Sequence, residues 1–275
     1  MKDPLGDVMK SFEHAYRRKL SSDDYVLIRL DGKAFHSYTR GLEKPFDPQL
    51  MEAMNRTTEK LCSTIQGVRL AYTESDEISL LITGWKETDT PPKNPTELWM
   101  GGVEAKLISI SAAIATAEFN AVREEQLDGG WGDPSLHHPH TALFDSRVWT
   151  FPGTAEGYQL VKQYFEWRRA DSIRNSITMA ASAHFSHKQL EFVNSTMKCQ
   201  LLREKGFPWE TLPDGFKFGR LLIKDTKSDV VTFTHKVTNE VQTIPVQRTY
   251  WKTVPYSDLE GVWTSETLPA PKEAL

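Results

Sequence analysis

Two acidic residues stand out because each adjoins a short run of strand-forming residues. Asp31 ends the run 25–30, and Asp76 lies between the runs 68–72 and 78–82. A right-handed crossover makes the first two strands parallel, so both carboxylates are expected at one edge of a sheet if the third strand lies between them. Carboxylates held this close repel each other unless a cation lies between them. Oxygen ligands select Mg²⁺, which completes its shell with waters and substrate phosphates.

Donors suited to a triphosphate follow the first of these carboxylates. Gly32 has no side chain, so a metal ion or a phosphate group can approach its backbone. Lys33, His36 and Lys44 supply donors for phosphate oxygens. Glu77, beside Asp76, either adds negative charge or simply faces the solvent. Taken singly, an Asp-Gly pair after a strand is typical of a plain turn. It is the joint placement of Asp31 and Asp76 that predicts a metal and nucleotide site.

The elements that must position these residues follow a recognisable order. A strand at 25–30 precedes a helix of about 20 residues that begins at Asp47-Pro48, a good start signal. Strands at 68–72 and 78–82, a helix at 97–123 and a strand at 147–151 complete a βαββαβ order, the split βαβ or ferredoxin-like arrangement. The expected fold is α+β, an antiparallel sheet with helices on one face.

The rest of the chain is expected to pack on this unit. An amphipathic helix is predicted at 4–20. We expect a catalytic domain at 1–152 and, at 153–275, an extension of helices and a β-hairpin that is not independent of it. The extension should contain helices at 155–170, 172–185 and 187–202 and strands at 220–223, 230–235 and 241–249. The Pro-containing tail, 268–275, is expected to be disordered.

Composition narrows the class of protein without identifying it. The chain has 275 residues, 39% of them hydrophobic, which is enough for a sizeable core. The net charge of −4 gives no general sign of nucleic-acid binding, although an enzyme needs only a local basic surface. The two cysteines have no paired spacing, and the chain shows neither an N-terminal signal core nor a continuous apolar run of membrane-spanning length. A cytoplasmic location and no membrane partner are therefore expected.

Several motifs together resemble one family. Positions 29–36 resemble the signature R-L-D-G-x-x-F-H of tRNA-His guanylyltransferases, and positions 71–79 resemble its second signature, centred on S-D-E. Lys44-Pro45, the stretch 144–147 with Pro152, and W-R-x-x-D at 167–171 match further elements in family order. The resemblance implies a polymerase-like palm that adds nucleotides to the 5′ end of tRNA in the 3′-to-5′ direction. It also implies a homotetramer.

The same resemblance implies a set of site residues. Asp31 and Asp76, with the Gly32 carbonyl, would hold two Mg²⁺ ions. The substrates would be GTP or another nucleoside triphosphate, with ATP activating a 5′-monophosphate. The implied nucleotide-binding residues are Asp31, Gly32, Lys33, Ala34, Phe35, His36, Lys44, Ser75 and Asp76. The implied contacts to RNA or triphosphate are Arg29, Arg169, Asp171, Arg174 and Asn175. An ion pair of Arg174 with Asp171 or Asp145 is the alternative for that residue.

One departure bears on the kind of reaction. Eukaryotic members carry His-Ile-Asn-Asn shortly after the W-R-x-x-D element, whereas this chain has Ile173-Arg174-Asn175-Ser176. In this respect it resembles the bacterial and archaeal guanylyltransferase-like branch, which is associated with template-dependent repair of 5′-truncated tRNAs. Both templated repair and addition of G to tRNA-His stay open at this point.

Two other classes of protein share parts of the pattern. A palm-fold enzyme similar to a nucleotide cyclase would use the same carboxylates on a nucleoside triphosphate alone, without RNA. A non-catalytic RNA-binding module can also be built on a split βαβ sheet, which normally displays aromatic side chains on exposed central strands. In the first three strands only Tyr25 and Tyr72 are aromatic, which disfavours the module.

Overall fold

A single antiparallel sheet organises the chain. The computed structural model describes residues 3–85, 97–128, 141–234, 236, 239–257 and 261–271. The six strands lie in the order β4-β1-β3-β2-β5-β6. Because β1 and β2 are each antiparallel to β3, which lies between them, they are parallel to each other, as predicted. The strands are β1 Tyr25–Gly32, β2 Val68–Glu74, β3 Glu77–Ile82, β4 Phe144–Phe151, β5 Arg220–Thr234 and β6 Val241–Pro255.

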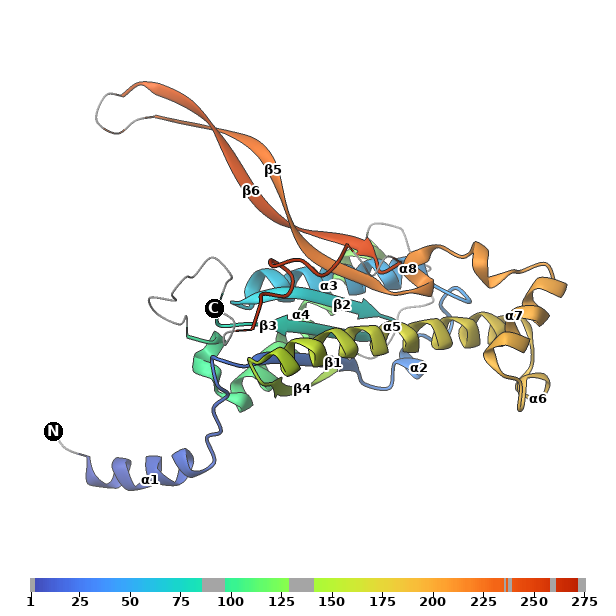
Figure 1. Ribbon diagram of the computed structural model, residues 1–275, viewed down its shortest axis with the longest axis horizontal. Coiled ribbons are helices and arrows are strands. Elements are labelled where there is room, and N and C mark those ends of the chain that lie inside the picture. Colours follow the sequence, from blue (N-terminus) through green and yellow to red (C-terminus); the bar gives the residue numbers. More distant parts are fainter. Residues whose placement is uncertain are drawn as a thin grey trace.

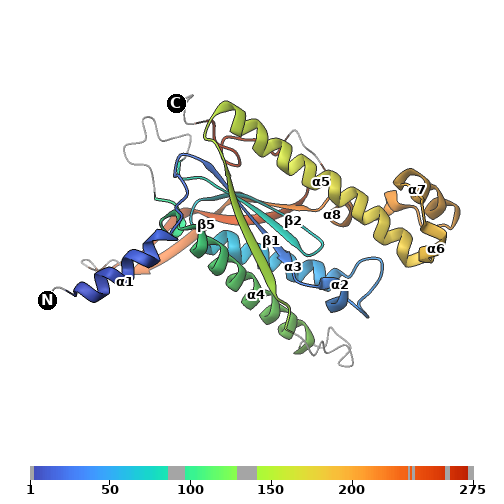
Figure 2. The ribbon, with the colours of Figure 1, turned by 90° about the horizontal axis from the view of Figure 1, so that it is seen from below.

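Helices cover both faces of the sheet (Figure 2). On one face lie α3 and α4, as predicted, and on the other lies α5 from the extension. Alternate β1 residues serve the two faces: Ile28 packs on the α3 and α4 side, and Leu27 on the α5 side. Burial on both faces explains why this strand is a continuous apolar run. The longer helices are α1 Pro4–Ala15, α3 Pro48–Thr64, α4 Glu104–Asp128, α5 Ala155–His184 and α7 Ser195–Glu204.

Short helices join these elements. They are α2 Phe35–Tyr38, α6 His187–Leu190 and α8 Asp214–Lys217, with 3-10 helices at Trp99–Gly102 and Trp209–Thr211. The start of α3 follows the predicted signal, since the Asp47 side chain accepts a hydrogen bond from the Leu50 amide at 2.8 Å. By length and composition alone α4 is able to cross a membrane, but its buried Leu107 and Phe119 belong to the core of the sheet.

The extension differs from its prediction in three places. The helices expected at 155–170 and 172–185 form one helix, α5, in which Asp171, between the two ranges, pairs with the buried Arg168 and the exposed Arg174 at i,i+3 spacing. The helix expected at 187–202 is two helices, since Phe192 has a φ of 60° and Asn194 caps α7 by accepting from the Met197 amide. The strands expected at 220–223 and 230–235 form one strand, β5.

The hairpin of β5 and β6 extends far beyond the other four strands of the sheet (Figure 1). Leu221 and Leu222 are buried in the core, and Ala71 in β2 pairs with Leu222. Further along, the strand is exposed, and the polar stretch 224–229 stays extended through its cross-strand pairing with β6. The sequence predicts a break between two strands here, because a polar run does not indicate a buried strand. The division at residue 152 stays a prediction, although β5 and the first three strands share one sheet.

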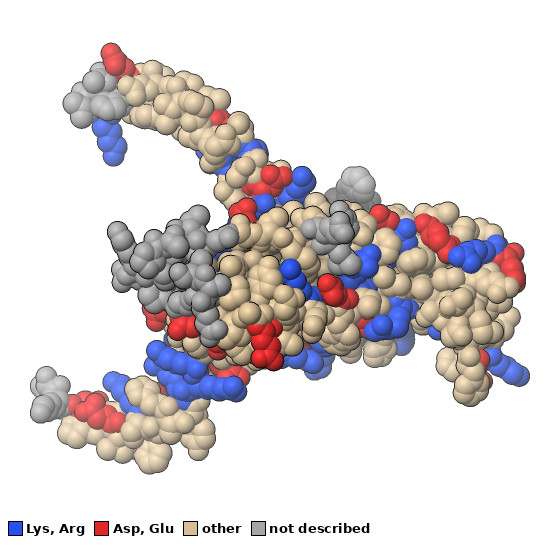
Figure 3. Space-filling model, viewed as in Figure 1, with Lys and Arg blue, Asp and Glu red and all other residues tan. Residues whose placement is uncertain are grey.

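Both ends of the chain also depart from expectation. Helix α1 ends at Ala15 and has no buried residue, and Lys and Arg side chains gather where it joins the body (Figure 3). The tail was expected to be disordered, and this is wrong for 268–271. Leu268 is buried, the Pro269 carbonyl accepts from the Tyr25 hydroxyl at 2.9 Å, and the Ala270 carbonyl accepts from Trp85 Nε1 at 3.0 Å.

Candidate active site

The end of β1 and the turn between β2 and β3 lie side by side. Asp31 is the Cα partner of Glu77 across the β1–β3 ladder, and the Gly32 amide donates to the Asp76 carbonyl at 3.0 Å. A glycine is required at this point, because a Cβ on Gly32 would lie 2.3 Å from the Phe35 ring. The topology therefore brings the two predicted carboxylates to one edge of the sheet.

Electrostatics at this edge favour a bound cation. Burial, helped by the nearby charges of Asp31 and Glu77, raises the pKa of Asp76 to about 6. The ion pairs of Asp31 with other described residues are long, 3.9 Å to Arg29 and 3.7 Å to Arg147. Within the described residues, no group of three or more His, Cys, Asp and Glu side chains is arranged to hold a metal ion. The protein therefore offers a metal ion two carboxylates and a backbone carbonyl oxygen. Waters and substrate phosphates would complete the coordination shell, and an all-oxygen shell of this kind suits Mg²⁺.

A cavity of about 710 Å³ is lined by Asp76 and by Gly32, the residue that follows Asp31. Of the residues predicted to bind nucleotide, Gly32, Ala34, Phe35, His36, Lys44, Ser75 and Asp76 line it. Asp31 and Lys33, also predicted, do not line it, although Asp31 directly precedes Gly32. Ala34 has a φ of 56° at the start of α2, which turns the backbone between Gly32 and His36. Most of the residues predicted around the nucleotide therefore share one cavity.

Part of the cavity lining is apolar and aromatic. Lys44 and Pro45, joined by a cis peptide bond, lead to Phe46, whose ring stacks on Phe216 of α8 at 4.8 Å between centroids. Met51 and Met179 line the same cavity. A ligand with a charged, metal-bound end and a flat ring matches this division. A nucleoside triphosphate has that chemistry.

The residues predicted to contact RNA or triphosphate lie in different surroundings. Asn175 lines the cavity, and Arg174 is exposed but pairs with Asp171 at 2.8 Å, the alternative that the sequence left open. Arg29 pairs with Glu77 at 3.3 Å. Arg169 holds the C-terminal segment, since its Nε donates to the Tyr256 carbonyl at 2.6 Å. None of Arg29, Arg169, Asp171 and Arg174 lines the cavity, and their contacts with RNA stay a prediction.

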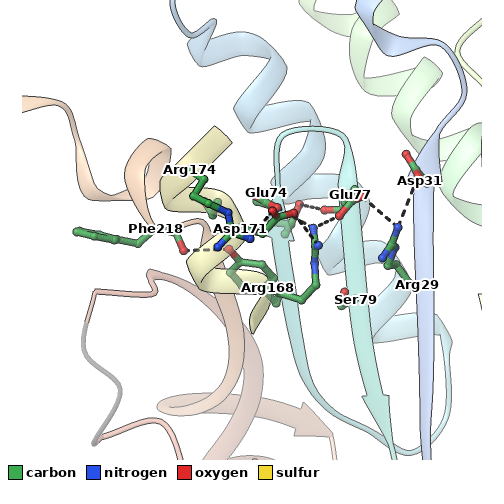
Figure 4. Close-up of polar contacts among 12 residues, drawn as sticks. Arg29, Asp31, Glu74, Glu77, Ser79, Arg168, Asp171, Arg174 and Phe218 are labelled. Atoms are coloured by element: carbon green, nitrogen blue, oxygen red, sulfur yellow. Dashed lines mark hydrogen bonds and ion pairs between the residues drawn. The ribbon is translucent and has the colours of Figure 1, made fainter. Parts of the chain in front are cut away.

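An ion-pair network under the turn was missed by the sequence reasoning (Figure 4). Arg168 on α5 pairs with Glu74 at 2.7 Å, with Asp171 at 3.0 Å and also with Glu77. The suggestion that Glu77 simply faces solvent is wrong, because its second oxygen pairs with Arg29. Burial raises the pKa of Glu74 to about 7, and the charge of Arg168 opposes this rise. The W-R-x-x-D motif was the signal in the sequence that singled out Arg168 and Asp171. It did not indicate that Glu74 and Glu77 are the partners of Arg168.

The fold and the site together define a class. A βαββαβ sheet with two carboxylates at one edge, beside a cavity suited to a nucleotide, is a palm-type nucleotidyltransferase.

Comparison with known proteins then identifies the family. A family model for tRNAHis guanylyltransferase matches residues 6–152, more than half of the chain. This protein belongs to the tRNAHis guanylyltransferase family. Its activity is nucleotidyl addition to tRNA in the 3′-to-5′ direction, as the motifs implied.

Solved structures and curated relatives agree over most of the chain. A bacterial tRNA(His) guanylyltransferase-like protein in complex with ATP is 34% identical with a TM-score of 0.76, covering 96% of this chain and 98% of that one. One in complex with GTP is 32% identical with a TM-score of 0.69, covering 94% of both chains. The tRNA(His) guanylyltransferase of Schizosaccharomyces pombe is 26% identical over 80% of each chain.

Proposed function

We propose that this protein repairs the 5′ end of truncated tRNA by Mg²⁺-dependent, template-directed nucleotide addition. The observation that carries the proposal is the placement of Asp31 and Asp76 at one sheet edge, beside a cavity lined by His36, Lys44 and the Phe46 ring. The likeness to the bacterial guanylyltransferase-like proteins supports repair. Ile173 to Ser176, which replace the eukaryotic His-Ile-Asn-Asn, point the same way.

The chain's own residues would divide the work between metal and nucleotide. Asp31, Asp76 and the Gly32 carbonyl would hold Mg²⁺. When bound, two such ions stabilise the attacking and leaving oxygens of an in-line displacement. Lys44 and His36 would donate to phosphate oxygens. The ring of Phe46, already stacked on Phe216, would offer an apolar surface to the base.

The covalent change is a phosphoryl transfer at the 5′ end of the RNA. The 3′-hydroxyl oxygen of the incoming nucleotide bonds to the activated 5′ α-phosphorus, and the hydroxyl proton is lost. Pyrophosphate leaves if the 5′ end is a triphosphate, and AMP leaves if ATP has activated a 5′-monophosphate. The ATP and GTP complexes of the similar structures support both nucleotides as substrates here.

One assay separates templated repair from G addition. A labelled tRNA lacking its first nucleotide is incubated with Mg²⁺ and each nucleoside triphosphate in turn, while the base opposite the vacant position is varied. We expect the added nucleotide to follow the template base. Addition of G to every template would show a strict tRNA-His guanylyltransferase. Pyrophosphate release without RNA would favour cyclase-like chemistry, and Mg²⁺-independent binding with no turnover would favour an RNA-binding module.

We further propose a homotetramer in the cytoplasm. The exposed Val230, Val241 and Ile244 on the β5–β6 hairpin support self-association, and the two free cysteines, Cys62 and Cys199, support a reducing compartment. Light scattering should give four times the protomer mass of 31.4 kDa. Fractionation of the source cells tests the location, and recovery outside the cytosolic fraction would contradict it.

A further inference from the structure

One arginine of α5 holds both ends of the turn that carries Asp76. The Nη2 atom of Arg168 donates to Glu74 Oε1 at 2.7 Å and also to Glu77 Oε2. Glu74 and Glu77 are Cα partners at the last rung of the β2–β3 hairpin. Ser75 and Asp76 are therefore the two residues of the turn, and one guanidinium spans its base (Figure 4).

The conformation of this turn requires contacts from outside the hairpin. Ser75 has a φ of 45°, in the left-handed region that is unfavourable for a residue with a side chain. Such a conformation persists where the surrounding structure determines it. Asp31 and Glu77 are Cα partners across the β1–β3 ladder beside this turn, and like charges directly opposite each other are destabilising. A cation fixed beneath the turn opposes their repulsion.

Arg168 is well suited to be that cation. Its side chain is 3% exposed, and the buried Phe165 anchors α5 on the sheet beside it. Asp171 orients the guanidinium by accepting from Nη1 at 3.0 Å. The planar guanidinium presents several donors in fixed directions, which lysine cannot reproduce. Arg29 pairs with the other oxygen of Glu77 at 3.3 Å and links the same network to β1.

The position of Arg168 excludes direct contact with a substrate in the cavity. It is buried and is not one of the residues that line the cavity, whereas Glu74, Ser75 and Asp76 are. We propose that Arg168 is a positioning residue that fixes the Ser75–Asp76 turn through Glu74 and Glu77 for nucleotide addition. This proposal rests on the function proposed above.

The test compares two substitutions of Arg168 with a matched control. Arg168→Met removes the positive charge. Arg168→Lys keeps the charge but loses the planar set of guanidinium donors. Arg56→Met is the control. Arg56 makes an exposed ion pair of 2.7 Å with Glu125, and this pair lies on the side of the sheet that α3 and α4 cover, away from α5. The rate of amide hydrogen exchange in the peptide 73–79 reports the stability of the turn directly and does not depend on enzymatic activity. Steady-state kinetics and tRNA affinity are measured on the same proteins.

We expect Arg168→Met to speed exchange in 73–79 and to lower kcat about 100-fold, the loss that a misplacement of roughly 1 Å can cause. The KM for the nucleoside triphosphate and the affinity for tRNA should stay within about threefold, which is less than 1 kcal/mol. Arg168→Lys should lie between wild type and Arg168→Met. Arg56→Met should match wild type.

Three results would overturn the proposal. The first is exchange and kcat equal to those of Arg56→Met. The second is faster exchange spread over all peptides, which would show general destabilisation; Arg168→Lys decides this point if Arg168→Met does not fold. The third is a loss confined to KM or tRNA affinity, which would make Arg168 a binding residue. If wild type adds no nucleotide, the proposed function fails, while the exchange of 73–79 still decides whether Arg168 holds the turn.

Discussion

Replacing Asp76 by Asn should make the metal-free protein more stable and the enzyme inactive. Burial raises the pKa of Asp76 from 3.8 to about 6. A carboxyl whose pKa is higher in the folded state than in the unfolded state destabilises the fold at every pH at which it is ionised, and the effect vanishes below the unfolded pKa. A rise of about two pKa units corresponds to roughly 3 kcal/mol at pH 8, an upper bound for a group that keeps some contact with solvent.

The assay is urea unfolding with and without MgCl₂, at pH 8 and at pH 3.5. Without metal at pH 8, Asp76→Asn should gain up to about 3 kcal/mol over wild type, and the gain should nearly disappear at pH 3.5, below the unfolded-state pKa of 3.8. Magnesium should stabilise wild type and not the variant, since a ligand that binds only the folded state raises stability. Nucleotide addition should fall about 100- to 1000-fold, the loss expected when charge stabilisation is removed from a transition state.

The control is Asp225→Asn on the exposed hairpin. Hydrogen bonding to Lys252 lowers the pKa of Asp225, so this substitution should give no gain in stability at pH 8. Equal stabilisation of wild type and Asp76→Asn by Mg²⁺ would refute the placement of the metal at Asp76. Full activity of Asp76→Asn would refute its role in the reaction.

Three further predictions follow from the geometry. Gly32→Ala should lower the free energy of unfolding by about 1–3 kcal/mol, because the new Cβ meets the Phe35 ring; urea unfolding measures this, and an unchanged midpoint would contradict the close approach. Phe46→Ala should raise the KM for the nucleoside triphosphate about fivefold if the ring contacts the base, as aromatic contacts contribute about 1 kcal/mol, and steady-state kinetics decide. Deleting 268–275 should cost about 3 kcal/mol by thermal or urea unfolding, from the lost burial of Leu268 and two hydrogen bonds; a truncated protein as stable as wild type would show that the segment is not bound.

The network around Arg168 places a structural requirement beneath the reaction. In this network a helix of the extension holds a turn of the catalytic sheet, so substitutions in α5 that touch no substrate should still affect nucleotide addition. Arg169, the next residue, acts elsewhere, because it binds the carbonyls of Tyr256 and Ser257. Adjacent arginines of one motif therefore serve different parts of the molecule.

Sequence alone determined the arrangement that brings Asp31 and Asp76 together. Strand and helix signals gave the βαββαβ order, and the handedness of crossovers made β1 and β2 parallel. These inferences work because hydrophobic periodicity and turn residues report local structure, and because few topologies are compatible with a given order of elements. The family signatures at 29–36 and 71–79 then supplied the chemistry.

Only the tertiary structure decided which distant residues meet. Arg168 and Glu74 are 94 residues apart, and the Tyr25 hydroxyl reaches a carbonyl 244 residues away. A break between two helices was expected at Asp171, but its ion pairs with Arg168 and Arg174 keep it inside α5. Periodicity shows that a face is buried but not what covers it, since the partner of a buried charge depends on the packing of whole elements. That packing, rather than any local pattern, places Arg168 beneath the turn that carries Asp76.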